Sequence, residues 1–458
     1  MPTGVVPDLD ALMQSLPDDS LVVEPDRMAN YRWDRAHDPD AGMPLAVVRA
    51  TCTEDVQAAV RFASAHGIPV VTRGAGTGLS GGSSAVDGCI VVSTERMRAI
   101  EVDPNTRTAT VGPGLMNGEV KAAVAEHGLW YPPDPSSFEI CSIGGNVATN
   151  AGGLCCAKYG VTTDYVLGMT VVLADGTAVE LGGPRLKDVA GLSLTKLFVG
   201  SEGTLGIITR VVLRLLPAPR IPATLVATFG TLEAACTAVL AITRRMRPSM
   251  LEFMDKASIN AVEDMTRMGL DRDAEALLVM QSDEPTGFAA VEIAAMAKFC
   301  EASGATEVFS TDDPDEGEAF VTARRIAIPA IERRGSLLLE DVGVPVPRLG
   351  DLVMGIATIS RAHDVEIAVI AHAADGNTHP LIVFDPMDAE QKSRAQAAYG
   401  EVMELAVGLG GTITGEHGVG RLKKPWLGLY LGDDVMALNR RIKNALDPDG
   451  ILNPGCVL

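Results

Sequence analysis

Two histidines flank a short turn in the C-terminal half of the sequence. The chain has only 7 His in 458 residues, and His372 and His379 lie on either side of Asp375-Gly376. That dipeptide favours a two-residue hairpin turn, which would pair His372 with His379 across two strands. The Cβ atoms of such a pair are about 5 Å apart, so both rings can bind one divalent ion at roughly 2.1 Å. The spacing therefore predicts a metal-binding hairpin.

A third metal ligand would have to come from elsewhere in the chain. The segment Gly415-Glu416-His417-Gly418 offers an acid and an imidazole between glycines. Flanking glycines let the backbone expose both side chains in a cleft. From the residues alone, an equally good alternative is a pair of hydrogen-bonded structural histidines plus a solvent-exposed glutamate.

A glycine-rich loop occupies residues 73–82, directly after an expected strand at residues 68–72. Consecutive glycines let backbone N–H groups turn toward one anionic centre, such as a phosphate or pyrophosphate. The loop is not a P-loop, because no Gly-Lys-Ser/Thr follows. It does not fit a Rossmann fold, because residues 82–88 are too short and too glycine-rich to form the required helix. An ordinary glycine-rich turn remains the alternative for this loop alone.

Two further segments, residues 132–153 and 200–208, are also rich in glycine. Together with the 73–82 loop they resemble the FAD-binding domain of the vanillyl-alcohol oxidase/p-cresol methylhydroxylase (PCMH) superfamily. The similar branch contains D-lactate dehydrogenases and the glycolate oxidase catalytic subunit, and the resemblance runs from about Leu45 to the end. It implies an α+β fold: a PCMH-type FAD-binding domain, then a ferredoxin-like α/β substrate (cap) domain, with a C-terminal segment, residues 442–455, that returns to the FAD domain.

The resemblance also implies where FAD binds. The first loop and Gly144-Gly145 would enclose the pyrophosphate, and residues 202–208 would lie beside the flavin and adenine ends. Because residues 73–82 contain no His and no Cys, we expect a non-covalent flavin. The residues expected to contact FAD are Arg73, Gly74, Ala75, Gly76, Thr77, Gly78, Ser80, Gly81, Asp134, Ser136, Ser142, Gly144, Gly145, Asn146, Thr149, Ala151, Gly152, Glu202, Gly206, Ile207 and Asn453.

The resemblance to this branch also suggests roles for the histidine pair and for residues 415–418. The resemblance implies that His372, His379 and Glu416 are the metal ligands, that His417 is the catalytic base, and that Arg324 binds the substrate carboxylate. Such a metal would chelate the hydroxyl and carboxylate of a 2-hydroxy acid while hydride passes to flavin N5. Two His and one carboxylate suit Zn²⁺, Mn²⁺ or Fe²⁺ equally. The alternative for Arg324 is a solvent-exposed helix face with two adjacent arginines.

Residues that differ from those of other members of the branch narrow the range of expected substrates. Relatives specific for D-2-hydroxyglutarate carry polar residues at positions matched to Ile328, Leu339 and Leu381, which are apolar here. A second carboxylate would lose its partners there, which favours D-lactate, glycolate or a similar aliphatic acid. The alternatives are a D-2-hydroxyglutarate dehydrogenase, an alkyl-glycerone-phosphate synthase-like transferase, a metal-dependent hydrolase without flavin, and an inactive subunit of a flavoprotein–iron–sulfur complex.

The elements that position these residues fall into two parts. A β-α-β pattern covers residues 47–72, and a similar pattern covers residues 109–128. Three prolines within residues 216–222 exclude a helix or central strand and predict a boundary between an FAD domain, residues 1–219, and a substrate/metal domain, residues 220–458. Beyond it, helices (231–246, 287–302) and strands (276–281, 366–371, 381–384) are expected. The active site is expected between the domains.

Composition excludes several classes of partner. The net charge is −21, so nucleic acid and anionic membranes are poor partners. We find no secretion signal, no membrane-spanning run and no Cys spacing typical of a zinc ribbon or iron–sulfur cluster. A cytoplasmic location is expected. A quinone, a cytochrome, an electron-transfer flavoprotein or a partner subunit could accept the electrons, oxygen is a further alternative, and a homodimer is compatible with the sequence.

Overall fold

The computed structural model describes residues 8–285 and 287–458. Contacts divide the chain into two compact units. The first contains the chain through Ala151, Val161–Ala218 and Glu416–Leu458, and the second contains Gly152–Gly160 and Pro219–Gly415. The chain thus enters the second unit for its long segment at Pro219. A single cut at residue 219 omits the final segment, 416–458, which packs with the first unit.

The first unit contains a small sheet with the order β1-β2-β4-β3. Strands β2, β4 and β3 are parallel, and β1 is antiparallel to β2. Helix α3, Thr53–His66, connects β2 to β3 as a β-α-β crossover and ends at Gly67, whose φ of 61° is left-handed. The strands are Leu21–Val22 (β1), Ala46–Arg49 (β2), Val70–Arg73 (β3) and Ile90–Ser93 (β4).

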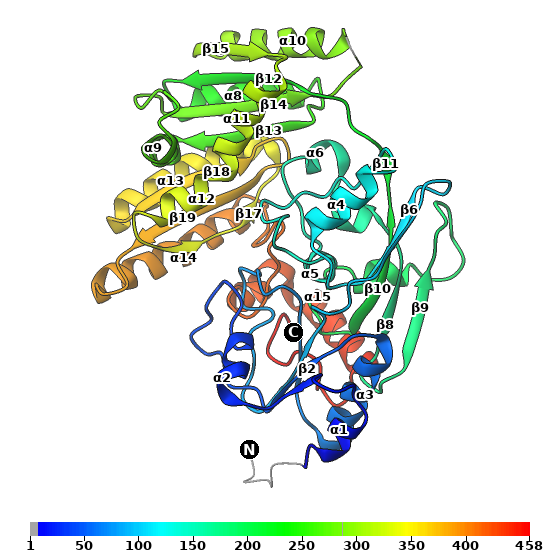
Figure 1. The fold of residues 1–458 in the computed structure, drawn as a ribbon. Coiled ribbons are helices and arrows are strands. Elements are labelled where there is room, and N and C mark those ends of the chain that lie inside the picture. Colours follow the sequence, from blue (N-terminus) through cyan, green and yellow to red (C-terminus); the bar gives the residue numbers. More distant parts are fainter. Residues whose placement is uncertain (1–7, 286) are drawn as a thin grey trace. The chain divides into compact units, whose positions relative to one another are not determined.

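A second sheet of the same unit is antiparallel, with the order β5-β6-β10-β8-β9. The pattern at residues 109–128 is split here, because β6 joins this sheet whereas β7, Leu129–Trp130, pairs with β11, Leu216–Pro217. Helices α4, α5 and α15 belong to the same unit (Figure 1), together with the short helices α1 (Asp10–Gln14), α2 (Pro25–Met28) and α7 (Leu194–Phe198). The bounds are Ile100–Asp103 (β5), Thr108–Val111 (β6), Val166–Val172 (β8), Ala178–Gly182 (β9), Ile207–Arg214 (β10), Asn117–Ala125 (α4), Ile143–Thr149 (α5) and Lys424–Leu446 (α15).

The second unit contains an eight-stranded sheet with the order β15-β12-β14-β13-β18-β19-β16, in which β17 also pairs with β19. Its first four strands occupy the positions 4-1-3-2 of a ferredoxin-like motif, with helices α8 and α10 as connections. The strands are Ala223–Phe229 (β12), Met250–Asp255 (β13), Ala276–Ser282 (β14), Ala305–Thr311 (β15), Ser336–Leu339 (β16), Val342–Gly343 (β17), Glu366–His372 (β18) and Asn377–Phe384 (β19).

One face of this sheet carries both the core and the histidines. Alternate residues of β13, β18 and β19 bury Met254, Ile370 and Leu381 in one cluster with α9, α11 and α12. His372 lies two residues from Ile370 on β18, and His379 lies two residues from Leu381 on β19. Both histidines therefore face the same side of the sheet as this cluster. The helices of the unit are Cys156–Tyr159 (α6), Leu232–Thr243 (α8), Lys256–Thr266 (α9), Phe288–Ala302 (α10), Pro314–Arg325 (α11), Ala327–Glu332 (α12), Leu349–His363 (α13) and Ala389–Gly408 (α14).

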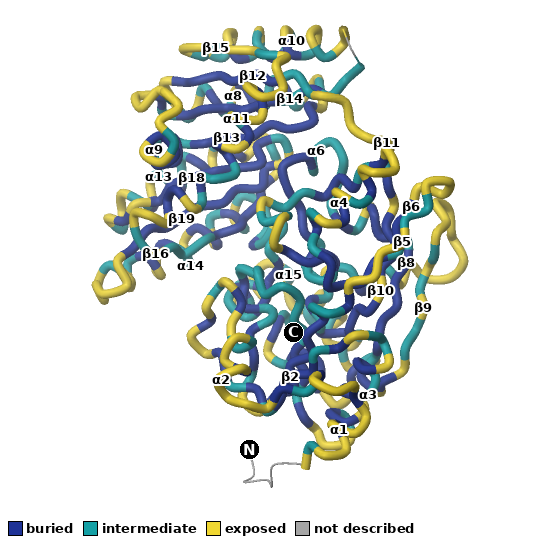
Figure 2. The backbone as a smooth tube through the Cα atoms, viewed as in Figure 1, coloured by how far each residue is buried: buried dark blue, intermediate teal, exposed yellow. Residues whose placement is uncertain are grey.

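Burial is greatest in the inner strands of the sheets in both units, whereas the edge strands β9 and β15 are partly exposed, as the colours of the backbone tube show (Figure 2). The fold confirms the predicted α+β class with a ferredoxin-like second part. Within the described residues, no helix combines the length and the apolar composition needed to cross a bilayer.

Candidate active site

The glycine loop begins where β3 ends, at Arg73. Gly76 and Gly81 have positive φ angles of 74° and 78°, which side chains other than glycine rarely adopt. The Ala75 N–H donates to Ser142 Oγ at 3.2 Å, and a Cβ on Gly74 would lie 2.3 Å from the same oxygen. The loop is therefore packed against the residue that caps α5.

The Arg73 guanidinium lies against the loop, where its Nη2 would be 2.2 Å from a Cβ on Gly76, and it also binds the N-terminal segment. Its guanidinium donates to the backbone carbonyls of Trp33 at 2.6 Å and Asn30 at 3.4 Å. Burial lowers the pKa of Arg73, while the nearby Asp34 carboxylate opposes that shift. In the first unit Arg73 thus fastens the N-terminal segment beside the loop, and its contact with FAD stays a prediction.

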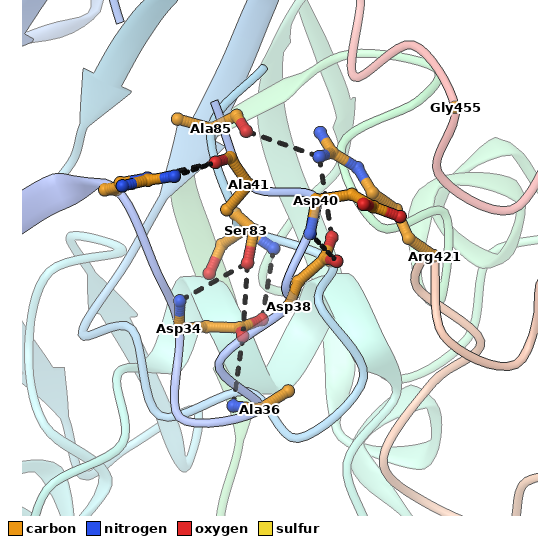
Figure 3. A network of polar contacts seen from close by, with 12 residues as sticks. Asp34, Ala36, Asp38, Asp40, Ala41, Ser83, Ala85, Arg421 and Gly455 are labelled. Carbon is orange, nitrogen blue, oxygen red and sulfur yellow. Dashed lines mark hydrogen bonds and ion pairs between the residues drawn. The ribbon is translucent and has the colours of Figure 1, made fainter. Parts of the chain in front are cut away.

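The N-terminal segment is held against the loop by a buried polar network (Figure 3). Asp34 accepts from the Ala36 N–H at 3.1 Å, from Ser84 Oγ at 3.3 Å and from the Ser83 N–H at 3.4 Å. Burial raises the pKa of Asp34 against these hydrogen bonds. Ala36 in turn donates its N–H to the Gly78 carbonyl at 3.2 Å. These bonds fix the outer side of the glycine loop, and sequence reasoning missed them because the segment contains no glycine motif.

Helix α5 starts close to the backbone before it. Ser142 caps the helix by accepting from the Gly145 N–H, and a Cβ on Gly144 would lie 2.6 Å from Pro113 Cβ. Asn146 is buried and accepts from Asn117 Nδ2 at 3.0 Å, and Thr149 Oγ1 donates to the Gly145 carbonyl at 3.1 Å. The other predicted FAD contacts near α5 lie in irregular segments on either side of it: Asp134, Ser136, Ala151 and Gly152.

The third predicted segment turns into β10. Gly206 approaches β8 so closely that a Cβ would lie 2.4 Å from Val171 Cγ1, and Ile207 is fully buried in the core beside β3. Asn453 donates through Nδ2 to the carbonyls of Gly82 at 2.8 Å and Glu202 at 2.7 Å. The structure thus brings the first loop, the third segment and the C-terminal turn together in the first unit.

In the second unit, the histidine hairpin has a different register from the predicted one. His372 pairs with Asn377, and His379 pairs with Ile370. The predicted two-residue turn at Asp375-Gly376 is wrong, because the loop between the paired strand ends comprises residues 373–376. A shift of two residues preserves which face each side chain occupies. The two imidazoles therefore remain neighbours, with ring centroids 5.2 Å apart and ring nitrogens within 4.8 Å.

Behind His372 lies a buried ionic network that sequence reasoning missed. Glu252 on β13 accepts from His372 Nδ1 at 2.8 Å and pairs with Arg324 Nη2 at 2.8 Å. The exposed fractions are 0% for Glu252, 1% for Arg324 and 3% for His372. A carboxylate on Nδ1 fixes the tautomer that leaves Nε2 as the ligand atom. The signal was available, because Glu252 interrupts an apolar strand, Met250–Asp255.

Arg324, predicted on an exposed or substrate-facing helix position, is buried at the end of α11. Its Nη2 group is 2.8 Å from a Glu252 carboxylate oxygen, yet Nε has no hydrogen-bond partner among the described residues. A buried N–H without an acceptor costs about 1–3 kcal/mol. An acceptor placed at Nε would remove that cost.

Asp341 is a second buried carboxylate beside the hairpin, 3.7 Å from His379 Nδ1. It accepts from Thr414 Oγ1 at 2.6 Å and from the Gly415 N–H at 3.0 Å. Glu416 follows Gly415 directly, so its Cα is about 3.8 Å from that of Gly415. His417 comes next, with Nε2 3.8 Å from Glu416 Oε1. The chain that carries the predicted acid and base is thus tied to the carboxylate beside His379.

Comparison with family models assigns both parts of the chain. Residues 218–457 match the C-terminal domain of FAD linked oxidases, and residues 44–182 match an FAD binding domain.

Similar proteins cover nearly the whole chain. Glycolate oxidase subunit GlcD of Bacillus subtilis (strain 168) is 40% identical over 416 residues, 90% of this chain and 88% of that protein. D-lactate dehydrogenase of Archaeoglobus fulgidus is 36% identical over 434 residues, 93% of this chain and 95% of that protein.

Among solved structures, p-cresol methylhydroxylase with substrate bound shares the fold with a TM-score of 0.83 at 19% identity, covering 98% of this chain and 95% of that chain. An alkyldihydroxyacetonephosphate synthase structure has a TM-score of 0.76 at 19% identity and covers 97% of this chain and 85% of that chain. At these identities the two structures describe the fold alone.

Proposed function

The chain belongs to the FAD-linked oxidases, and we propose that it oxidises a small D-2-hydroxy acid to the 2-oxo acid. It is an FAD-dependent oxidoreductase, since relatives named glycolate oxidase subunit and D-lactate dehydrogenase match about nine tenths of the chain. The observation that carries the choice of substrate class is the His372–Glu252 pair, because an imidazole oriented by a buried carboxylate is typical of a metal ligand. The metal would hold a hydroxyl and a carboxylate together.

The first unit supplies a non-covalent FAD site in this proposal. Gly74, Gly76 and Gly144 let the backbone pack closely, since a Cβ at any of them would lie 2.2–2.6 Å from a neighbouring atom, and the loop between Arg73 and Gly82 has no His or Cys to bond the flavin. When bound, FAD supplies the hydride acceptor. The chain's own contribution is to hold the pyrophosphate with backbone N–H groups.

We infer that a divalent metal binds His372 and His379, whose ring nitrogens lie within 4.8 Å of each other in the second unit, with Glu416 as the third ligand that the sequence predicts. Glu252 lies beside Nδ1 of His372, and Asp341 lies beside Nδ1 of His379. Two imidazoles and a carboxylate suit Zn²⁺, Mn²⁺ or Fe²⁺. Such a metal lowers the pKa of a coordinated hydroxyl and orients the acid.

Substrate binding and proton transfer would fall to two further residues. The free edge of the Arg324 guanidinium is suited to a carboxylate, and His417, next to Glu416, would accept the hydroxyl proton. Leu381 is fully buried, and Ile328 and Leu339 pack against the same core. These three apolar positions favour D-lactate or glycolate over D-2-hydroxyglutarate.

The relatives bear on the remaining alternatives. A flavin-free hydrolase is disfavoured because residues 44–182 match an FAD binding domain. The word "subunit" in the relatives' name supports a partner subunit as electron acceptor, which we propose in preference to a quinone, a cytochrome or oxygen.

Steady-state kinetics with an artificial dye acceptor test the substrate. We expect kcat/KM to be higher for D-lactate or glycolate than for D-2-hydroxyglutarate, with activity lost on chelation and restored by Zn²⁺ or Mn²⁺. A preference for D-2-hydroxyglutarate would refute the argument from the apolar positions, and full activity after exhaustive chelation would refute the metal.

A further inference from the structure

The turn at residues 416–420, which begins with Glu416 and His417, is held by side chains from two distant segments of the first unit. Glu202 accepts through Oε1 from the Val419 N–H and through Oε2 from the Gly420 N–H, both at 2.8 Å. Ser80 donates its hydroxyl to the His417 carbonyl at 3.2 Å. The backbone on the C-terminal side of His417 is thus fixed by hydrogen bonds that Glu202 and Ser80 make to main-chain groups.

Hydrogen bonds to neighbouring residues hold the backbone of Glu202 in place. Its N–H donates to the Ala148 carbonyl of α5 at 2.9 Å, and its carbonyl accepts from Asn453 Nδ2 at 2.7 Å. Its φ of 49° lies in the left-handed region, a conformation that non-glycine residues adopt only where the surroundings impose it. The side chain is buried. Both ends of Glu202 are therefore specified, one by the backbone and one by the turn.

Two glycines in the turn allow its backbone to lie close to Glu202 and Ser80. Gly418 and Gly420 have positive φ angles of 83° and 54°. A Cβ on Gly418 would lie 2.9 Å from the Glu202 carboxylate, and one on Gly420 would lie 2.0 Å from the Ser80 carbonyl oxygen. Only glycines let the backbone come this close to Glu202 and Ser80.

Beyond the turn, the chain stays attached to the same structure. The N–H groups of Arg421 and Leu422 donate to the Ser80 carbonyl at 3.0 and 3.1 Å. The Arg421 guanidinium donates to the Ala85 carbonyl at 3.3 Å and lies 3.7 Å from an Asp38 carboxylate oxygen (Figure 3). The turn is therefore clamped along its length.

We propose that Glu202 is a positioning residue for His417: its carboxylate fixes the backbone of the turn and does not contact FAD. The inference rests on the proposed function, in which His417 takes the hydroxyl proton. It replaces the expectation that Glu202 binds the cofactor. A displacement of about 1 Å at a reacting group can slow a reaction about 100-fold, so a turn without Glu202 slows proton transfer while flavin binding persists.

The test is Glu202→Gln in the FAD-loaded, full-length protein. Glutamine keeps the size of the side chain but turns an NH₂ group toward one of the two backbone N–H groups. Glu263→Gln is the matched control, because Glu263 is also buried and also accepts two backbone N–H groups, those of Gly269 and Leu270 at 3.0 Å, in the second unit.

We expect the FAD content and the flavin spectrum of Glu202→Gln to match wild type, kcat to fall about 10- to 100-fold, KM to change little, and the solvent isotope effect on flavin reduction to rise. Amide exchange in residues 418–420 should accelerate in Glu202→Gln and not in Glu263→Gln. Loss of FAD with unchanged turnover per bound flavin would overturn the inference, as would unchanged exchange.

Two further variants keep the outcome readable. If Glu202→Gln does not fold, Ser80→Ala removes the hydroxyl bond to the His417 carbonyl and should accelerate exchange in the same turn; unchanged exchange there overturns the clamp. His417→Gln tests the proposed function separately. Wild-type turnover in that variant would refute His417 as the base, and the exchange rates would still decide whether Glu202 holds the turn.

Discussion

At the scale of single residues, buried carboxylates orient the side chains to which the proposed chemistry is assigned. Glu252 lies between an imidazole and a guanidinium, both buried. Removing one member of such a buried ionic network leaves an uncompensated charge, which costs several kcal/mol. Glu252 therefore orients His372 and also compensates the charge of Arg324 in an apolar core.

The Glu252→Gln variant should bind the metal about 10- to 100-fold more weakly. The amide is neutral, so it no longer strengthens His372 as a donor and no longer balances Arg324. Metal affinity measured by competition with a chromophoric chelator checks this. Glu275→Gln is the control, because that exposed side chain pairs only with Lys256 at 2.9 Å among the described residues. Equal metal affinity in wild type and Glu252→Gln would exclude Glu252 from the metal site.

The raised pKa of Glu202 predicts that the free energy of unfolding depends on pH. Burial raises its pKa from 4.5 to about 7, against the hydrogen bonds from Val419 and Gly420. Between those pH values the folded protein binds a proton that the unfolded chain has released, so the stabilisation from Glu202 is complete below about pH 4.5 and is lost as pH rises through 7. The upper limit is roughly 3 kcal/mol.

Denaturant unfolding of wild type and Glu202→Gln from pH 5 to pH 8 measures this term by difference. Wild type should lose free energy of unfolding relative to the variant as the pH rises. A difference that is flat with pH, or that grows in favour of wild type, would show that Glu202 has an ordinary pKa.

At the scale of elements, the sequence was most informative where a turn or period is enforced locally. The helix at residues 53–66 and the strand at residues 276–282 have clear patterns, and both occur close to the predicted bounds. The hairpin face of His372 and His379 followed from alternation, whereas its register did not. The observed register is accompanied by pairing of β19 with β17 and by the Val344 carbonyl, 2.1 Å from where a Gly376 Cβ would lie, and no local pattern reports those contacts.

The candidate site divides in the same way. His372, His379 and the glycine loops were evident because rare residues and clustered glycines stand out in one sequence. Glu252, Asp341 and Asp34 were not evident, because a buried carboxylate is recognised by its partners, and those come from distant strands and loops.

Helix α5 supplies a prediction for FAD binding. Gly144→Ala places a Cβ 2.6 Å from Pro113 Cβ, which should destabilise the protein by about 1–3 kcal/mol and weaken FAD binding about tenfold. Gly428→Ala on α15 is the control, because nothing lies within 4 Å of its Cβ and alanine stabilises a helix by up to about 1 kcal/mol. FAD titration of both variants checks this; wild-type affinity in Gly144→Ala would argue against α5 as part of the FAD site.

At the scale of the whole molecule, one architecture serves different reactions. The chain shares its fold with p-cresol methylhydroxylase and alkyldihydroxyacetonephosphate synthase at 19% identity, so the fold alone does not choose the chemistry. In the proposed function, the choice comes from side chains on the sheet of the second unit together with Glu416 and His417 of the first unit.

Each unit has its own hydrophobic core, which predicts two unfolding transitions. FAD at 100 times its Kd stabilises the unit that binds it by about 2.7 kcal/mol. Calorimetry of protein with and without FAD should show one transition shifted by several degrees and the other unchanged. Equal shifts in both would mean that the units unfold together.

The absorbance of the purified protein under anaerobic conditions tests the central claim most directly. The protein should be yellow, and addition of D-lactate should bleach the flavin band whereas L-lactate should not. A colourless protein that takes up no added FAD, or a flavin that L-lactate bleaches as fast as D-lactate, would contradict the proposal that the chain is an FAD-dependent D-2-hydroxyacid dehydrogenase.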